Sequence, residues 1–168
     1  SGHRRRVDPD RLRRISLMEV YRLANARRAN DLSGEGARRA GGRWNRIGTA
    51  VLYTAASRAL ATLEVLVHIP LSFVPNEYRM LTLQVPDDSL QTLPFDTLPD
   101  GWAGLAPPDA AKQLISDGLA DNRFLVLKVP SAIVDGEYNF LINPAHRRAG
   151  EVRIIDNRPF LFDMRLFN

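Results

Sequence analysis

Apolar and polar residues alternate near the start of the chain in the way that is typical of a β-strand. Over residues 17–23 (LMEVYRL), Met18, Val20 and Arg22 fall on one face. The other face carries Leu17, Glu19, Tyr21 and Leu23. Arg22 is therefore a charge on an otherwise apolar face, close to the end of the strand. One interpretation is an edge charge that discourages aggregation. The alternation alone does not separate that interpretation from a binding role.

Residues 24–50 show no clean hydrophobic period and contain five glycines, which predicts a long loop. Long loops in compact domains tend to carry function. The pair Gly41-Gly42 permits positive φ angles and a close approach of the backbone to a ligand. Neither GxGxxG nor GxxxxGK[ST] occurs, so no phosphate-binding loop of those kinds is predicted, and Trp44 is expected to pack.

The apolar run over residues 51–54 (VLYT) predicts a short strand, and the next stretch predicts a helix between Ser57 and Pro70. Further elements are predicted in this order: a strand over 78–85, a proline-rich loop over 86–108 laid on apolar surface, a helix over 110–119, strands over 123–129 and 139–142, and two last strands over 151–155 and 160–167 joined by a turn at 157–159. Many strands, few helices and no repeat favour one α+β domain, not a doubly wound parallel sheet.

The predicted helix after Ser57 carries a single acid, Glu64. On a helical wheel, Glu64 and His68 lie in the sector of Leu60 and Val67. A carboxylate in such a sector is costly to desolvate unless something pairs with it. Two interpretations stand level on spacing alone. One is an i,i+4 pair with His68, which contributes about a few tenths of a kcal/mol, and the other is a catalytic acid that faces a cleft.

Composition fits one compact domain, because the 168 residues are 45% hydrophobic and 25% charged. No run of 18 apolar residues and no secretory leader pattern occurs, so no membrane span is expected. The chain has no cysteine, and its three histidines lack HExxH spacing. Neither a disulfide nor a protein-held metal is therefore expected, and a cytoplasmic location is favoured.

The net charge of +4 belongs to residues 1–14, which hold six arginines against Asp8 and Asp10. A solvated tail is the favoured interpretation of this basic arm. Because the rest of the chain is neutral overall, no direct nucleic-acid binding is expected. The start Ser-Gly-His lacks methionine, so part of the arm can be non-native. The alternative to an enzyme is a non-catalytic module that uses the arm to bind nucleic acid or an acidic partner.

Two stretches together resemble the RES domain family, which is named for an arginine, a glutamate and a serine. They are SGEGARRAGGRWNRIGTAVLYTAASRALATLEVLVH over residues 33–68 and VPSAIVDGEYNFLINPAH over residues 129–146. The resemblance extends over roughly residues 17–168 and implies a single RES domain over 15–168. One departure lies at residues 116–119 (SDGL), where relatives tend to have a Gly-Asp pair, and the arm lies outside the pattern.

The resemblance implies an ADP-ribosyltransferase-like α+β fold with a twisted, split β-sheet core and a few helices. It also implies a toxin of a bacterial toxin–antitoxin pair that consumes NAD+ as its substrate and uses no metal. The ADP-ribose would pass to water, phosphate or a protein target. The expected partner is a helix-turn-helix antitoxin of the Xre type that blocks the active site, and a homodimer within that complex is a further expectation.

Six positions match the site residues of the family, namely Arg22, Arg43, Tyr53, Glu64, Ser131 and Asn143. By the resemblance, Glu64, Tyr53 and Arg22 are catalytic, and all of the six except Glu64 bind NAD+. Arginine forks suit a pyrophosphate, an aromatic ring suits the cationic nicotinamide, and a fixed carboxylate suits the positive charge that develops on the ribose.

Each of these residues also has an ordinary structural interpretation, which the sequence leaves open. Only Lys112 and Lys128 are lysines among the 23 basic residues, so any one arginine can reflect coding bias. Tyr53 can be a core tyrosine with a bonded hydroxyl, Ser131 a turn serine and Asn143 a loop cap.

Overall fold

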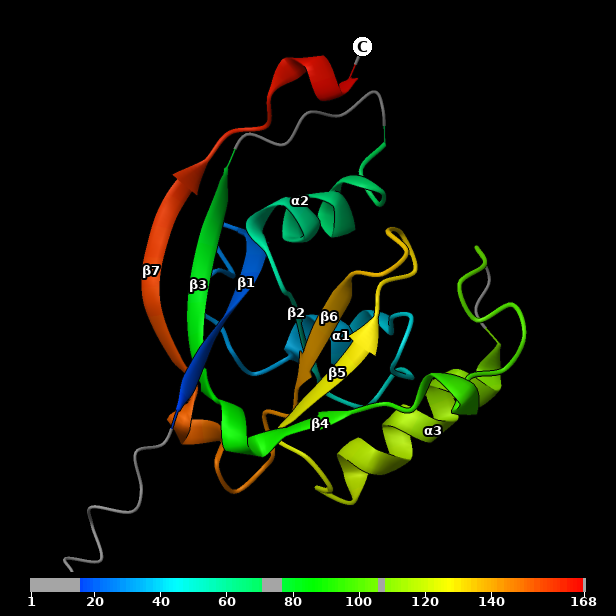
Figure 1. The fold of residues 1–168 in the computed structure, drawn as a ribbon. Coiled ribbons are helices and arrows are strands. Elements are labelled where there is room, and N and C mark those ends of the chain that lie inside the picture. The colour runs from blue at the N-terminus through cyan, green and yellow to red at the C-terminus, as the bar shows by residue number, and fades with distance from the viewer. Residues whose placement is uncertain (1–15, 71–76, 106–107, 168) are drawn as a thin grey trace, which may run out of the picture.

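The computed structural model describes residues 16–70, 77–105 and 108–167, so the predicted basic arm over residues 1–14 lies outside the described part of the chain. The described helices and strands are β1 (Leu17–Asn25), α1 (Glu35–Ala40), β2 (Leu52–Ala55), α2 (Arg58–Leu66), β3 (Tyr78–Pro86), β4 (Leu90–Thr92), α3 (Asp109–Ala120), β5 (Val126–Pro130), β6 (Tyr138–Ile142) and β7 (Arg153–Phe160). They form the mixed α+β fold that was predicted (Figure 1).

The seven described strands form one sheet in the order β4-β5-β6-β2-β1-β3-β7, in which only β4 and β5 run parallel. The sheet is almost divided between β1 and β2. β1 pairs with β3 along its whole length, but it pairs with β2 only where Tyr21 lies opposite Ala55. The half β1-β3-β7 stands nearly upright in Figure 1, whereas β4 and β5 slant across the view. The expected split in the sheet is therefore confirmed.

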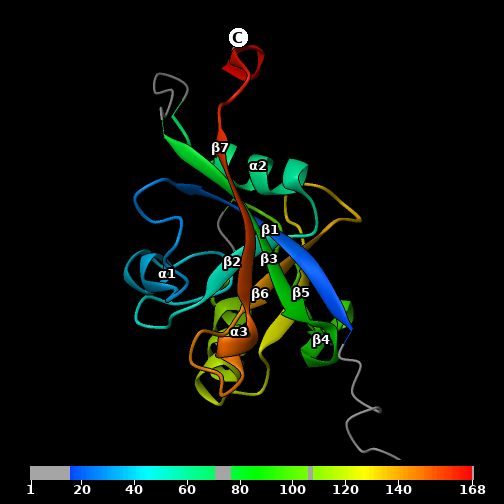
Figure 2. The ribbon, with the colours of Figure 1, turned by 90° about the vertical axis from the view of Figure 1, so that its left-hand side faces the viewer.

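Each half of the sheet has its own helix, and one apolar cluster joins the halves. That shared cluster contains Val20, Leu81 and Leu83 from one half and Leu52, Val126 and Phe140 from the other. α2 packs on the β1-β3-β7 half through Leu60 and Ala61 against Leu23, Met80 and Phe162. α3 packs on the other half through Ile115 and Leu119 against Val129 and Leu141. Figure 2 shows α2 and α3 at opposite ends of the molecule.

The start of α2 was predicted correctly, because Ser57 caps it. The Ser57 hydroxyl accepts a hydrogen bond from the Leu60 amide at 3.1 Å, and Ser57 itself has extended backbone angles. The helix ends at Leu66, earlier than the predicted stop at Pro70, and the residues between them form a turn.

Residues 24–50 are not entirely a loop, since α1 lies within them. This six-residue helix buries no side chain, so no hydrophobic period marks it in the sequence. On the exposed face of α1, the Glu35 carboxylate accepts hydrogen bonds from the Nε atoms of Arg38 and Arg39, at 2.6 and 2.8 Å, which stabilise the helix. Gly34 precedes the helix with a φ of 70° and lies so close to the Val51 backbone that an added Cβ would be 2.7 Å from the Val51 nitrogen.

The proline-rich segment contains β4, which the sequence analysis missed. β4 has only three residues and pairs in parallel with β5. Part of the segment lies on apolar surface as expected, because Leu93, Leu98 and Trp102 belong to the α3 cluster or pack against it.

The prediction of two strands at the C-terminus is wrong. β7 runs without a break through Asn157-Arg158-Pro159, and Met164–Phe167 forms a 3₁₀ helix. Pro159 is tolerated because β7 is an edge strand that pairs only with β3. The Arg79 side chain donates hydrogen bonds to the side-chain and backbone oxygens of Asn157, at 2.6 and 3.1 Å. These hydrogen bonds hold residues 157–159, for which a turn was predicted, in an extended conformation.

Candidate functional site

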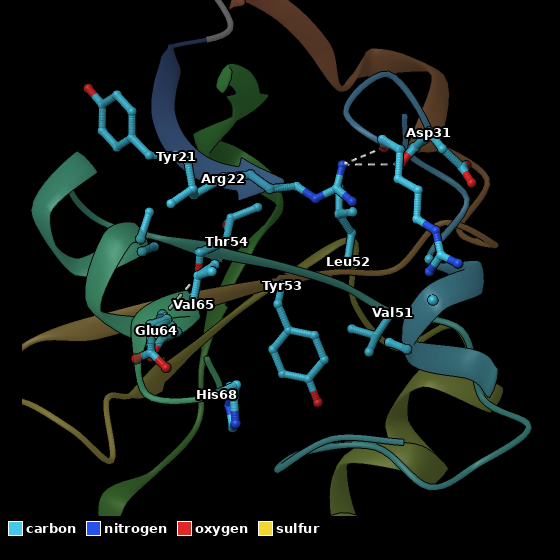
Figure 3. Close-up of a pocket in the computed structure, with 18 of the residues that line it drawn as sticks. Tyr21, Arg22, Asp31, Val51, Leu52, Tyr53, Thr54, Glu64, Val65 and His68 are labelled. Atoms are coloured by element: carbon cyan, nitrogen blue, oxygen red, sulfur yellow. Dashed lines mark hydrogen bonds between the residues drawn. The ribbon is translucent and has the colours of Figure 1, made fainter. Parts of the chain in front are cut away.

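A cavity of about 310 Å³ opens where β1 and β2 diverge, at the division between the halves of the sheet. Parts of β1, β2, α2 and β6 line it, together with the segment that leads from Arg28 through α1. Figure 3 shows Arg22, Tyr53 and Glu64 arriving at this space from β1, β2 and α2. A cavity of this size with a few convergent polar groups is a typical small-molecule site.

Arg22 is half-buried on the wall of the cavity, and one edge of its guanidinium is anchored to the backbone. Its Nη1 donates hydrogen bonds to the carbonyl oxygens of Arg28, Ala29 and Asp31, at 3.4, 3.1 and 3.2 Å. Burial lowers the pKa of Arg22. Its Nε and Nη2 donate to no acceptor in the part of the chain that the structure describes, so this edge is available to a ligand. The edge-charge interpretation is wrong, because β1 lies between β2 and β3.

Glu64 is half-buried in the same cavity and is held by Ser131. The Ser131 hydroxyl accepts from the amides of Ile133 and Val134, at 3.1 and 3.2 Å, and donates to Glu64 Oε1 at 3.1 Å. The two amides occupy the oxygen and thereby direct its hydrogen at the carboxylate. Burial raises the pKa of Glu64, and hydrogen bonding from the Ser131 and Asn139 side chains opposes that rise only in part. A carboxylate with a raised pKa in a cavity is a functional candidate.

The structure favours the cleft interpretation of Glu64 over the helix-pair interpretation. Glu64 and His68 both line the cavity, yet the hydrogen bond that Glu64 accepts comes from Ser131. The described side chains of Glu64 and His68 form no salt bridge with each other.

Tyr53 presents its ring to the cavity and turns its hydroxyl away from it (Figure 3). The hydroxyl donates to Asn45 Oδ1 at 2.7 Å and accepts from the Trp44 amide at 3.0 Å. Burial raises the pKa of this hydroxyl, so it stays protonated. Gly41 has the expected positive φ, at 69°, but the close approach at Gly42 is to the Tyr53 hydroxyl. The lack of a side chain at Gly42 leaves room for the Tyr53 hydroxyl, and Tyr53 in turn forms part of the cavity wall.

We expect Gly42→Ala to lower the free energy of unfolding by about 1–3 kcal/mol. An added Cβ would lie 2.6 Å from the Tyr53 hydroxyl and 2.9 Å from Asn45 Oδ1, so the hydrogen-bonded network must shift. Denaturant unfolding measures the effect. Gly150→Ala is the matched control, because nothing lies within 4 Å of a Cβ added there. Equal stability of the two variants would contradict this account of Gly42.

Arg43 is not among the residues that line the cavity. Its Nη1 donates to the Trp102 carbonyl at 2.7 Å and its Nη2 to the Gly104 carbonyl at 3.0 Å. The fork that was expected to meet a pyrophosphate therefore anchors the proline-rich segment, and Arg43 reaches Glu64 through its charge. The neighbouring Trp44 is buried and stacks on Trp102 with ring centroids 5.6 Å apart, which confirms that it packs.

Asn143 is also not brought to the cavity. It is 1% exposed, and its amide donates to the Leu119 carbonyl at 3.2 Å and to Asn122 Oδ1 at 3.1 Å. Its own Oδ1 accepts from the Ala145 amide at 3.1 Å. These hydrogen bonds join the C-terminal end of α3 to the turn after β6. The contacts of Asn143 therefore agree with the interpretation as a loop cap.

The cavity lining includes Asn139 and Arg28, which the sequence analysis did not select as site residues. Asn139 is a polar residue inside the apolar strand YNFLI, which is a signal that could have been read. Arg28 lies in a turn of a segment rich in arginine, and nothing in the sequence separates it from Arg27.

The described residues contain no group of three or more His, Asp or Glu side chains placed to hold a metal ion. None of the described helices is long and apolar enough to cross a membrane.

Comparison with known proteins places the chain in a family. The model of the RES domain matches residues 19–163. A protein of Sphingobium sp. (strain YBL2) named Prs ADP-ribosylating toxin is 39% identical over 154 residues, which cover 90% of this chain and 96% of the relative. A Pseudomonas putida (strain KT2440) protein named Toxin Res is 41% identical over 140 residues, covering 82% and 93%.

A solved structure has the same fold. It is that of the M. tuberculosis MbcT–MbcA toxin–antitoxin complex, which covers 87% of this chain and 85% of its own with a TM-score of 0.69 and 22% identity. The family match extends over both halves of the sheet and over every element that lines the cavity. The chain belongs to the RES domain family.

Proposed function

We propose that this chain is a toxin that consumes NAD+ by breaking the bond between nicotinamide and ribose. The observation that carries the proposal is the pairing, in one cavity, of the carboxylate held by Ser131 with the free edge of Arg22. A carboxylate and a guanidinium edge are the two groups that a cationic glycoside with a pyrophosphate tail requires. The naming of the Sphingobium relative as an ADP-ribosylating toxin supports the same chemistry.

In the proposed reaction the C–N bond breaks, and its electron pair goes to the nicotinamide nitrogen. Nicotinamide leaves as a neutral molecule, so no general acid is needed. Positive charge passes to the ribose, as in glycoside hydrolysis, and the Glu64 carboxylate stabilises it. The acceptor then bonds to the anomeric carbon and loses a proton. The ring of Tyr53 forms a cavity wall that can stack on the cationic nicotinamide.

We further propose that the acceptor is a protein, because the relative at 39% identity is named for acting on Prs. The test is incubation of the purified chain and NAD+ with a bacterial lysate and with purified Prs, followed by mass spectrometry. We expect an ADP-ribose adduct on protein that is absent with Glu64→Gln. Release of nicotinamide with only free ADP-ribose or its phosphate ester as the second product would contradict a protein acceptor.

The proposed partner is an antitoxin of the Xre type that covers the cavity, with a homodimer of this chain inside the complex. The fold is shared with the toxin of a toxin–antitoxin complex, which supports a partner of this kind. Co-purification with the candidate antitoxin, followed by an NAD+ assay with and without it, tests the proposal. Full activity of the complex would contradict a partner that blocks the cavity.

Arg28 is the residue that we propose as the second cation for the pyrophosphate, in place of the Arg43 fork. Its exposed side chain lines the cavity, and its Nη1 lies 3.7 Å from where a Cβ on Gly36 would be. The described residues offer its guanidinium no hydrogen bond or salt bridge. Since its backbone carbonyl accepts from Arg22, both guanidinium groups belong to the same stretch of wall.

We expect Arg28→Ala to raise the KM for NAD+ about tenfold with little change in kcat, because the pyrophosphate is bound alike in ground and transition states. Arg27→Ala is the matched control, since Arg27 is exposed and lies outside the cavity wall. Steady-state kinetics of both variants tests this. The same KM for the two variants would remove Arg28 from the binding site.

A further inference from the structure

We propose that Asn139 is a ribose-binding residue, whose side-chain oxygen accepts a hydrogen bond from a hydroxyl of the nicotinamide ribose beside Glu64. This inference rests on the proposed function and extends it to the recognition of the sugar. No role for this position follows from the motifs that identified the other site residues.

Asn139 lines the cavity from β6, where this strand pairs with β2. It is opposite Ala55 in the ladder, and its side chain is 8% exposed while lining the cavity. A primary amide buried to that extent must find partners for two donors and an acceptor.

The orientation of the amide follows from its single short contact. Nδ2 donates to the Thr54 carbonyl oxygen at 3.3 Å, so the nitrogen and not the oxygen faces that carbonyl. Glu64 lines the same cavity, and hydrogen bonding from the Asn139 side chain lowers the pKa of its carboxyl. The Thr54 carbonyl and the Glu64 carboxylate are both acceptors, so the amide nitrogen of Asn139 is the atom that suits them. The amide oxygen Oδ1 then points away from the Thr54 carbonyl.

The side-chain oxygen Oδ1 accepts from no donor among the described residues. No described side-chain nitrogen or oxygen is both fully buried and without a partner. Because Oδ1 has no protein partner, it must therefore keep open surface, and the cavity is the space that its side chain lines. An acceptor that is open to the cavity is a place for a donor on a ligand.

The cavity thus offers a ligand two acceptors, the Glu64 carboxylate and the Asn139 amide oxygen. Neighbouring acceptors match the vicinal hydroxyls of a ribose, which offer two donors at adjacent carbons. If Glu64 accepts from one ribose hydroxyl and Asn139 from the other, the second hydroxyl is bound without a second carboxylate. The Glu64 charge can then remain close to the anomeric carbon. A second charge there would raise the pKa of Glu64 further.

The experiment compares NAD+ with two analogues that lack the 2′- or the 3′-hydroxyl of the nicotinamide ribose. The kcat/KM for each is measured with the wild-type chain, with Asn139→Ala and with Asn30→Ala, an exposed asparagine outside the cavity wall. We expect the wild type and Asn30→Ala to prefer NAD+ over one analogue by about tenfold or more. We expect Asn139→Ala to reduce that preference to about twofold, because the hydroxyl and the acceptor form the same bond.

Asn139→Asp serves as a second variant that keeps an oxygen in the same place. It should retain the preference for NAD+ over the analogue even if its overall rate falls. A changed pKa of Glu64 affects kcat/KM for both substrates alike and therefore cancels in their ratio. A merely structural asparagine would lower all rates and leave the preference as in the wild type. That outcome, or a wild type indifferent to both hydroxyls, would overturn the inference. Turnover of NAD+ by the wild type tests the proposed function separately.

Discussion

Glu64→Gln is expected to lower the rate of NAD+ consumption by about 10²–10³-fold or more while NAD+ still binds. Positive charge reaches the anomeric carbon only as the glycosidic bond breaks, so a carboxylate aimed there acts chiefly on the barrier. The amide has nearly the same shape and can still accept the hydrogen bond from Ser131, whose geometry is fixed by two backbone amides. Stopped assays of NAD+ and calorimetric binding measure the two quantities. Loss of binding together with activity would assign Glu64 to binding instead.

The same substitution is expected to raise stability at neutral and alkaline pH. Burial raises the pKa of Glu64 in the folded chain, so the unfolded chain releases this proton first as the pH rises. The ionised carboxylate therefore costs stability above its folded pKa, and the cost disappears below about pH 4, near the pKa of glutamate in unfolded chains. Denaturant unfolding of wild type and Glu64→Gln across this range measures the difference.

Glu35→Gln is the matched control for that stability measurement, with the opposite sign. Hydrogen bonds from Arg38 and Arg39 lower the pKa of Glu35 to about 2. Its ionised form therefore contributes stability that is present above the unfolded pKa and is lost as the pH falls toward the folded pKa. We expect Glu35→Gln to lose stability where Glu64→Gln gains it. A loss of stability for Glu64→Gln at neutral pH would show that the site carries no strained charge.

Activity should follow the ionisation of the same carboxyl. Since only the charged form stabilises the ribose cation, we expect kcat to fall as the pH drops through the raised pKa of Glu64, at a higher pH than an ordinary glutamate would give. A pH–rate profile of the wild type measures this.

Arg22→Lys is expected to raise the Kd for NAD+ about tenfold or more while the chain stays folded. Nη1 of the guanidinium donates to the backbone carbonyls of residues 28, 29 and 31. In the proposed complex with NAD+, the free edge with Nε and Nη2 would bind the pyrophosphate. A lysine nitrogen can reach the carbonyls or the phosphate, but it has no second edge. Calorimetry with NAD+ on the Glu64→Gln background measures the affinity without turnover.

Arg22→Ala separates the two tasks of the guanidinium. It removes the donor to three carbonyls as well as the charge, so we expect loss of stability in addition to the loss of affinity. Arg22→Lys should lose affinity with a much smaller loss of stability. If Arg22→Lys binds NAD+ as the wild type does, the pyrophosphate is not held by this residue.

Local patterns predicted most of the fold. The alternation in residues 17–23 and 78–85 identified β1 and β3, and the Ser57 cap identified the start of α2. Elements without a local pattern were missed or wrong. α1 buries no side chain, and β7 passes through Pro159 because the strand lies at the edge of the sheet. Neither fact can be read from neighbouring residues, since each depends on what lies across the sheet or on the surface.

Four of the residues that the family motifs selected are brought together by the structure. Arg22, Tyr53 and Glu64 line one cavity, with Ser131 bonded to Glu64. Arg43 could not be placed, because its partners at Trp102 and Gly104 lie in a segment without any pattern of its own. Asn139 was missed for the opposite reason: its neighbour Thr54 comes from a strand far away in the sequence, and only the pairing of β2 with β6 brings them together.

Release of nicotinamide from NAD+ by the purified chain tests the central claim most directly. The chain at a fixed low concentration is mixed with excess NAD+, and free nicotinamide is quantified over time by mass spectrometry, with Glu64→Gln purified and assayed in parallel. The proposed chemistry predicts release catalysed by the wild type and almost none by the variant, whether or not a protein acceptor is present to take the ADP-ribose. Equal release by the two folded proteins, or intact NAD+ after incubation with the wild type and its acceptor, would contradict it.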